Sequence, residues 1–117
     1  MESFVSPEQV AERVMEIARR FNLKVSSQDT TLHTYKARVE ISRESFVQIY
    51  YNTRKNKFLL ALVKHNKRLF GFDKLDEKCH EHPEKEPEKH IEKPCSEMNL
   101  EKFILKAIKL VKEQSHG

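Results

Sequence analysis

The sequence predicts an α+β domain, in which an antiparallel meander sheet of four to five strands carries an N-terminal and a C-terminal amphipathic helix on one face. Apolar residues recur with the helical period at both ends of the chain and with the strand period in its middle. The 117 residues suffice for one hydrophobic core and are too few for two. We therefore expect a single domain over residues 1–117.

Residues 6–21 predict the first helix. Ser6 is a suitable N-cap, Pro7 favours the first helical position, and Gln9 can complete a capping box. The apolar stripe that follows consists of Val10, Val14, Ile17 and Phe21. Asn22 is expected to end this helix.

The middle of the chain predicts the sheet. Leu23 and Val25 predict a short extended segment, and residues 26–31 a turn or loop. Further strands are expected over residues 35–41, 45–52, 57–65 and 68–72. Residues 57–65 are apolar on both faces, which is typical of a central strand, and Asn66 and Lys67 predict a tight turn after it.

Residues 74–95 predict a long connection rich in Pro, Lys, Glu and His. Pro83, Pro87 and Pro94 interrupt regular structure there. Connections of this length in compact domains are usually functional or disordered.

The second helix is expected from Asn99, which is a suitable cap. Its apolar stripe consists of Leu100, Phe103, Ile104, Ala107, Ile108 and Val111. Lysines near its C-terminal end, at 106, 109 and 112, complement the helix dipole.

The charge balance favours acidic partners, nucleic acid among them. The net charge is +4, although residues 74–93 are net negative. A phosphate-binding surface would use Arg38, Arg43, Arg54, Lys55, Lys57, Lys64, Lys67 and Arg68, and the alternative is an ordinary solvated surface. A charged fraction of 34% with two glycines is typical of thermophilic proteins.

The sequence predicts a cytoplasmic protein with no membrane association. It contains no apolar run of about 20 residues, and its N-terminus lacks the features of a secretory signal. With two cysteines and no export signal, we expect reduced thiols and no disulfide framework.

The connection also concentrates groups able to bind a metal ion. Cys79, His80, His82 and His90 offer thiolate and imidazole ligands, which zinc prefers, and Cys95 follows. The paired CxxC units of zinc ribbons are missing. We therefore expect no cofactor, with a zinc site on these four residues as the alternative.

The same histidines can instead serve as acid and base. Imidazole exchanges protons near neutral pH, and two imidazoles beside a cation can cleave a phosphodiester without a metal. We expect His80 and His82 as the acid and base, Arg68 as the phosphate clamp and Asp73 as an orienting group. Substrate contacts are expected from His90, His65 and Lys67.

Plainer interpretations stay open beside these. A Lys-, Glu- and Pro-rich connection with exposed histidines can be a solvated loop. Phe70 and Phe72 are interpreted as core residues, the alternative being base-stacking platforms.

Residues 46–91 resemble the small TumE-like family of toxin components of toxin–antitoxin modules. The family motifs R-x-x-x-(Y/F)-D, H-x-H-P and P-x-x-H fall on Arg68, Phe72 and Asp73, on His80, His82 and Pro83, and on Pro87 and His90. The chain departs from the family where Phe72 replaces a tyrosine and Lys74 an asparagine. The resemblance implies a growth-inhibiting protein, neutralised by a cognate antitoxin, with a nuclease-type activity.

The combined prediction is a toxin that acts on RNA through residues of the 74–95 connection. The alternatives are a non-catalytic module that binds an acidic partner on a basic sheet face, and a metal-stabilised protein. Unpaired edge strands of a small sheet would also support a homodimer.

Overall fold

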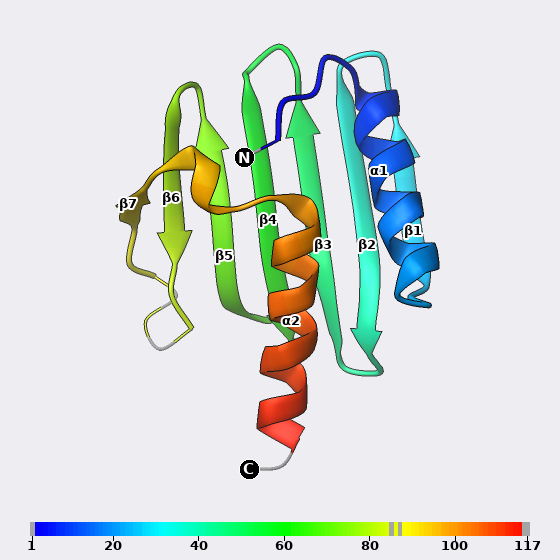
Figure 1. Cartoon of the computed structure of the whole chain (residues 1–117), viewed down its shortest axis with the longest axis vertical. Helices are drawn as coiled ribbons and strands as arrows, with labels where there is room; N and C mark the ends of the chain where they lie inside the picture. The colour runs from blue at the N-terminus through cyan, green and yellow to red at the C-terminus, as the bar shows by residue number, and fades with distance from the viewer. Residues whose placement is uncertain (1, 85, 87, 116–117) are drawn as a thin grey trace.

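The computed structural model describes residues 2–84, 86 and 88–115, so that Pro87 of the family resemblance lies outside the described residues. These residues form one seven-stranded antiparallel sheet and two α-helices. The elements are α1 (Pro7–Arg20), β1 (Val25–Thr30), β2 (Thr34–Ser42), β3 (Ser45–Asn52), β4 (Lys57–Lys64), β5 (Lys67–Leu75), β6 (Lys78–His82), β7 (Ile91–Lys93), the short 3₁₀ helix η1 (Cys95–Glu97) and α2 (Leu100–Ser115). The strands lie in the sheet in chain order, as a meander (Figure 1).

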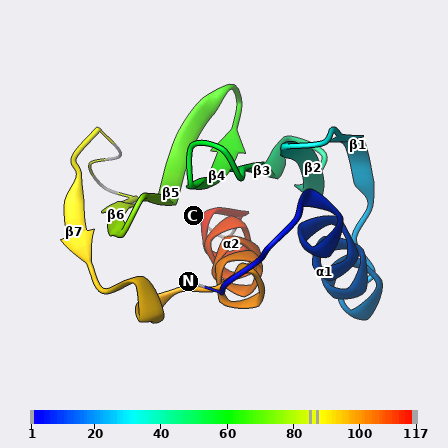
Figure 2. The ribbon, with the colours of Figure 1, turned by 90° about the horizontal axis from the view of Figure 1, so that it is seen from above.

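The α+β class and the position of both helices are confirmed. Figure 2 shows α1 and α2 on the same side of the curved sheet, which leaves the other face without a helix. Neither helix of the described residues is long and apolar enough to cross a membrane.

Local capping explains where the helices begin and end. The Ser6 hydroxyl accepts a hydrogen bond from the Gln9 N–H, and the Gln9 side chain accepts one from the Val5 N–H, one residue before the expected partner. Asn22 follows α1 with a φ of 55°, the left-handed conformation that commonly ends helices. Asn99 caps α2 by accepting from the Lys102 N–H at 2.8 Å.

The core lies between the two helices and the adjacent sheet face. Alternate residues of the central strands point into it, and the helix stripes close it from the other side. Its fully buried members include Val10, Val14, Ile17, Val39, Val47, Ile49, Leu62, Phe72, Leu100, Phe103 and Ile104. Phe70 stacks on Phe103 with the ring centroids 5.4 Å apart, so Phe70 and Phe72 are core residues as expected.

The predicted count of four to five strands was too low, because an exposed edge strand and short strands beside prolines carry weak sequence signals. Residues 26–31 were expected to be a turn or loop, yet β1 extends to Thr30. Most of β1 is exposed at the sheet edge, so hydrogen bonds to β2 hold it without an apolar alternation.

The prediction of one long connection over residues 74–95 was also wrong. It contains β6 and β7, and β5 extends to Leu75. Pro83 and Pro94 directly follow β6 and β7, because a proline ends a strand without preventing a short one before it. Half of the described residues of this segment therefore belong to strands of the sheet.

The tight turn after β4 is displaced by one residue from its expected position. His65 and Asn66 form it, with φ values of 50° and 64°. Positive φ at both central residues is the signature of a two-residue type I′ hairpin. His65 is thus a turn residue and does not end a strand.

Candidate functional site

The β5–β6 hairpin brings an acid and two histidines together on the sheet face that carries no helix. In the strand register Asp73 pairs with His80, and Gly71 pairs with His82. Phe72 points into the core, so its neighbour Asp73 points to the other face. His80 and His82, two residues apart on β6, share that face with Asp73.

His82 is the buried member of this group. Its Nε2 lies 2.8 Å from Oδ2 of Asp73, and only 2% of its side chain is exposed. Because a carboxylate oxygen accepts, Nε2 of His82 is the donor, which fixes the tautomer of a neutral ring. His82 can therefore orient Asp73, but the burial keeps its ring from a large substrate.

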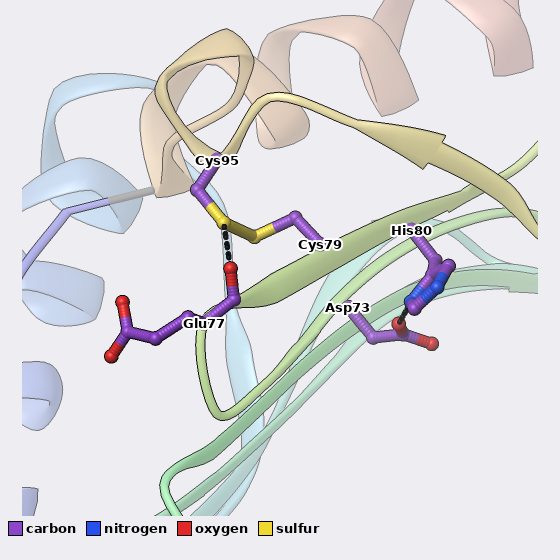
Figure 3. The surroundings of a disulfide bond; sticks show 5 residues. All are labelled: Asp73, Glu77, Cys79, His80 and Cys95. Atoms are coloured by element: carbon purple, nitrogen blue, oxygen red, sulfur yellow. Dashed lines mark hydrogen bonds and ion pairs between the residues drawn. A yellow bond between two sulfur atoms is a disulfide. The ribbon is translucent and has the colours of Figure 1, made fainter.

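His80 is the partly accessible member. Its Nδ1 lies 3.6 Å from Oδ1 of Asp73, and 30% of its side chain is exposed. Figure 3 shows the two side chains pointing toward one another from adjacent strands. One carboxylate thus contacts two imidazoles through its two oxygens.

His90 returns to this group from the segment before β7. Its ring lies edge-on to both others, with centroids 4.3 Å from His82 and 6.1 Å from His80. His90 is itself exposed. We call Asp73, His80, His82 and His90 the histidine cluster.

A shallow cleft of about 280 Å³ opens beside the histidine cluster. Its lining comprises Lys57, Leu59, Asp73, Lys74, Leu75, His80 and His90. His82 is absent from this lining. The cleft thus offers two imidazoles, a carboxylate and two lysines to a ligand.

Arg68 approaches the cluster because Gly71 has no side chain. A Cβ on Gly71 would lie 3.4 Å from Cδ of Arg68 and 3.4 Å from Cδ2 of His82. Arg68 and His82 therefore lie beside the same backbone position, although Arg68 is absent from the lining of the cleft. No role was expected for Gly71 from the sequence, although a glycine inside a strand often marks such a close approach.

His65 and Lys67, expected as substrate contacts, do not join the cluster. They belong to the β4–β5 hairpin, at the far end of β5 from Asp73, and His65 lies eight positions or roughly 25 Å of extended strand away. His65 instead pairs with Glu44, with Nε2 and Oε2 3.2 Å apart. The turn geometry places both residues at the wrong end of the strand.

The expectation of reduced cysteines is contradicted. Cys79 and Cys95 form a disulfide that joins β6 to η1, and Cys79 is buried (Figure 3). Residues that lie 16 apart in the chain meet because β6 and β7 pair and lead η1 back beside β6. A bonded sulfur cannot coordinate a metal as a thiolate, so Cys79 is removed from the alternative zinc set.

Without Cys79, the alternative zinc site would depend on the imidazoles of His80, His82 and His90. Among residues 2–84, 86 and 88–115, no group of three His, Cys, Asp or Glu side chains has the geometry to hold a metal ion. In the structure, Nε2 of His82 is already hydrogen-bonded to Asp73.

The expected basic surface is divided between the two ends of the sheet. Arg54, Lys55 and Lys57 lie at or beside the β3–β4 turn, whereas Arg43, Lys64, Lys67 and Arg68 lie at or beside the opposite turns. Arg38 lies between them, in the middle of β2. These residues do not form one continuous patch.

Comparisons of the chain with protein-family models, curated proteins and solved structures give no significant match. The function proposed below therefore depends on the residues, their geometry and the motif resemblance.

Proposed function

We propose that this protein is a ribonuclease that needs no metal and acts as the growth-inhibiting component of a toxin–antitoxin module. The observation that carries the proposal is one carboxylate, Asp73, in contact with two imidazoles, beside a third imidazole at the edge of a cleft that contains lysines. Imidazoles held in this way can transfer protons near neutral pH without assistance from a metal.

The accessible histidines, His80 and His90, are assigned as acid and base. This changes the pair expected from sequence, because His82 is buried while His90 is exposed. One imidazole takes the proton of a ribose 2′-hydroxyl, whose oxygen attacks the adjacent phosphorus. The other protonates the departing 5′-oxygen, which yields a 2′,3′-cyclic phosphate and a 5′-hydroxyl.

The other residues position these groups and compensate charge. Asp73 orients His80 through Oδ1, and His82 holds Asp73 through Oδ2. Lys57 lines the cleft, where its ammonium group can stabilise the negative charge that grows on the phosphate. Arg68 extends this cationic surface beyond Gly71.

The toxin assignment is supported by the TumE-like motifs, whose Arg68, Asp73, His80, His82 and His90 converge on one face of the sheet. It implies a cognate antitoxin as the partner.

The test uses purified protein and a single-stranded RNA in the presence of EDTA. We expect the wild type to release products with 2′,3′-cyclic phosphate ends. Loss of either proton-transfer group typically costs 10²- to 10⁴-fold in rate, so H80A and H90A should each lose at least about 100-fold. H33A, in the turn between β1 and β2, is the matched control and should cleave at the wild-type rate.

Expression in growing cells tests the toxin assignment separately. The wild type should arrest growth, and the H80A/H90A double variant should not at equal expression. Wild-type toxicity in the double variant, or wild-type protein that leaves RNA intact, would refute the catalytic assignment.

A second candidate, the non-catalytic binding module, is favoured by the basic side chains on the face without helices. Lys36 and Arg38 are both exposed there. This candidate predicts salt-sensitive binding of an acidic partner with no turnover.

A further inference from the structure

The sheet face that carries no helix connects the histidine cluster to a row of basic and aromatic residues. Directly paired residues cross five strands in the order Lys36, Tyr50, Leu59, Asp73 and His80. A parallel row contains Arg38, Gln48, Ala61, Gly71 and His82. These pairings make the cluster one end of a continuous surface that reaches β2.

Tyr50 is the aromatic centre of this surface. Its half-buried ring has Nζ of Lys36 at 5.6 Å and Nζ of Lys57 at 5.9 Å from the ring centroid. The Asn52 amide donates to the Tyr50 hydroxyl at 2.9 Å, which restricts the ring orientation. Both ammonium groups lie over the ring, so a base that stacks on Tyr50 would take their place and leave their charges for the phosphates on either side.

The distance from Tyr50 to the cluster suits one bound strand. Tyr50 and His80 are separated by three strand-to-strand steps, or about 14 Å. Lys57 belongs both to the Tyr50 surroundings and to the cleft. A chain of phosphates could therefore run from Tyr50 past Lys57 to the histidines.

We propose that this face binds single-stranded RNA, with Tyr50 stacking on one base and Lys36 and Lys57 contacting the flanking phosphates. The strand must be single because a base within a duplex is already stacked and cannot lie on Tyr50. The inference rests on the proposed function, since it assigns the class and path of the RNA that reaches His80 and His90.

The binding test uses a probe that cannot be cleaved. A fluorescein-labelled single-stranded RNA with 2′-O-methyl groups lacks the attacking hydroxyl, so fluorescence anisotropy reports binding alone. Removing a stacking platform typically weakens binding about tenfold or more, and we expect that loss for Y50L. Y50F keeps the ring and should bind within about twofold of the wild type.

The salt dependence of binding isolates the phosphate contacts. K36Q should lower the slope of log affinity against log salt by about 0.7, the value for one lost contact to a single strand. K109Q is the charge-matched control, because Lys109 is exposed on α2, on the helix side of the sheet. K109Q should leave the slope unchanged.

The outcomes separate this inference from the proposed function. If Y50L cleaves RNA and binds the probe as the wild type does, the platform is refuted while the ribonuclease assignment survives. If the wild type binds the probe through Tyr50 but cleaves no unmodified RNA, the platform is supported and the ribonuclease fails. Binding of poly-glutamate but not of the probe would overturn the inference in favour of an acidic protein partner.

Discussion

Asp73 holds the fully enclosed His82 by one carboxylate oxygen, at 2.8 Å, while its other oxygen faces the partly exposed His80. A buried imidazole without a partner would cost free energy, so this contact serves stability. The same contact fixes the carboxylate toward the cleft. Asp73 therefore links the packing of β6 to the geometry of the accessible imidazole.

Replacing His82 should affect stability more than replacing His90. H82A leaves a cavity and a partly buried carboxylate without its donor, which should lower the free energy of unfolding by about 2 to 3 kcal/mol. H90A removes an exposed ring and should stay within about 0.5 kcal/mol of the wild type. Urea denaturation followed by circular dichroism measures both.

H82Q is the control for the His82 contact, because the amide nitrogen of glutamine can donate to Asp73 from nearly the same position. We expect H82Q to recover part of the stability lost in H82A. If H82A unfolds at the same urea concentration as the wild type, the buried contact is not formed in solution.

Enlarging Gly71 should disturb the cluster from the backbone side. A Cβ there would meet the Leu60 carbonyl oxygen at 3.3 Å and the Arg68 and His82 side chains at 3.4 Å. G71A needs a shift of a few tenths of an ångström and should change stability by less than about 1 kcal/mol, whereas G71V should cost about 1 to 3 kcal/mol. Both variants should also slow RNA cleavage, G71V more. Wild-type stability and activity in G71V would show that the two side chains do not meet over this position.

The disulfide should stabilise the domain and hold β6 in place. A cross-link between cysteines 16 residues apart lowers the conformational entropy of the unfolded chain. In the chain-entropy model this stabilises the folded state by about 3 kcal/mol. Dithiothreitol should therefore lower the melting temperature of the wild type but leave that of a C79S/C95S variant unchanged. Alkylation of the denatured, unreduced protein should modify neither cysteine, and modification of both would contradict the bond.

The fold was predictable wherever burial imposes a period on the sequence. Tyr35, Ala37 and Val39 alternate because one face of β2 is buried, and Val10, Val14 and Ile17 recur because one side of α1 is buried. The residues of β1 are mostly exposed and carry no such pattern. These residues form a strand because they pair with β2, and their own sequence does not reveal this pairing.

The members of the histidine cluster were predictable from the sequence, but His65 and Lys67 were wrongly added to them, and which histidine is buried was not predictable. The motif spacing identified Asp73, His80 and His82, and an antiparallel hairpin then places Asp73 opposite His80. Which histidine is buried depends on the return of His90 from a later segment, a contact that spacing cannot give. The disulfide was missed for the same reason, because the pairing of β6 with β7 brings its cysteines together.

Alkaline pH should destabilise the protein through Tyr35. Tyr35 is fully buried, its hydroxyl donates to Gln28 at 2.7 Å, and burial raises its pKa from 10.0 to about 12. The folded state therefore keeps its proton at a pH where the unfolded chain has already lost it. Because the unfolded state then binds fewer protons, stability falls as pH rises from 10 toward 12.

This loss should reach about 1 kcal/mol at pH 11 and about 3 kcal/mol above pH 12, and it should be absent below pH 10. Y35F provides the control, since it cannot ionise and loses only the hydrogen bond to Gln28, by a constant amount of about 1 kcal/mol. Urea denaturation of both proteins should show wild type the more stable at pH 8, with the difference shrinking and then reversing above pH 11. A difference that stays constant across this range would mean that the Tyr35 hydroxyl ionises as easily in the folded protein as in the unfolded chain.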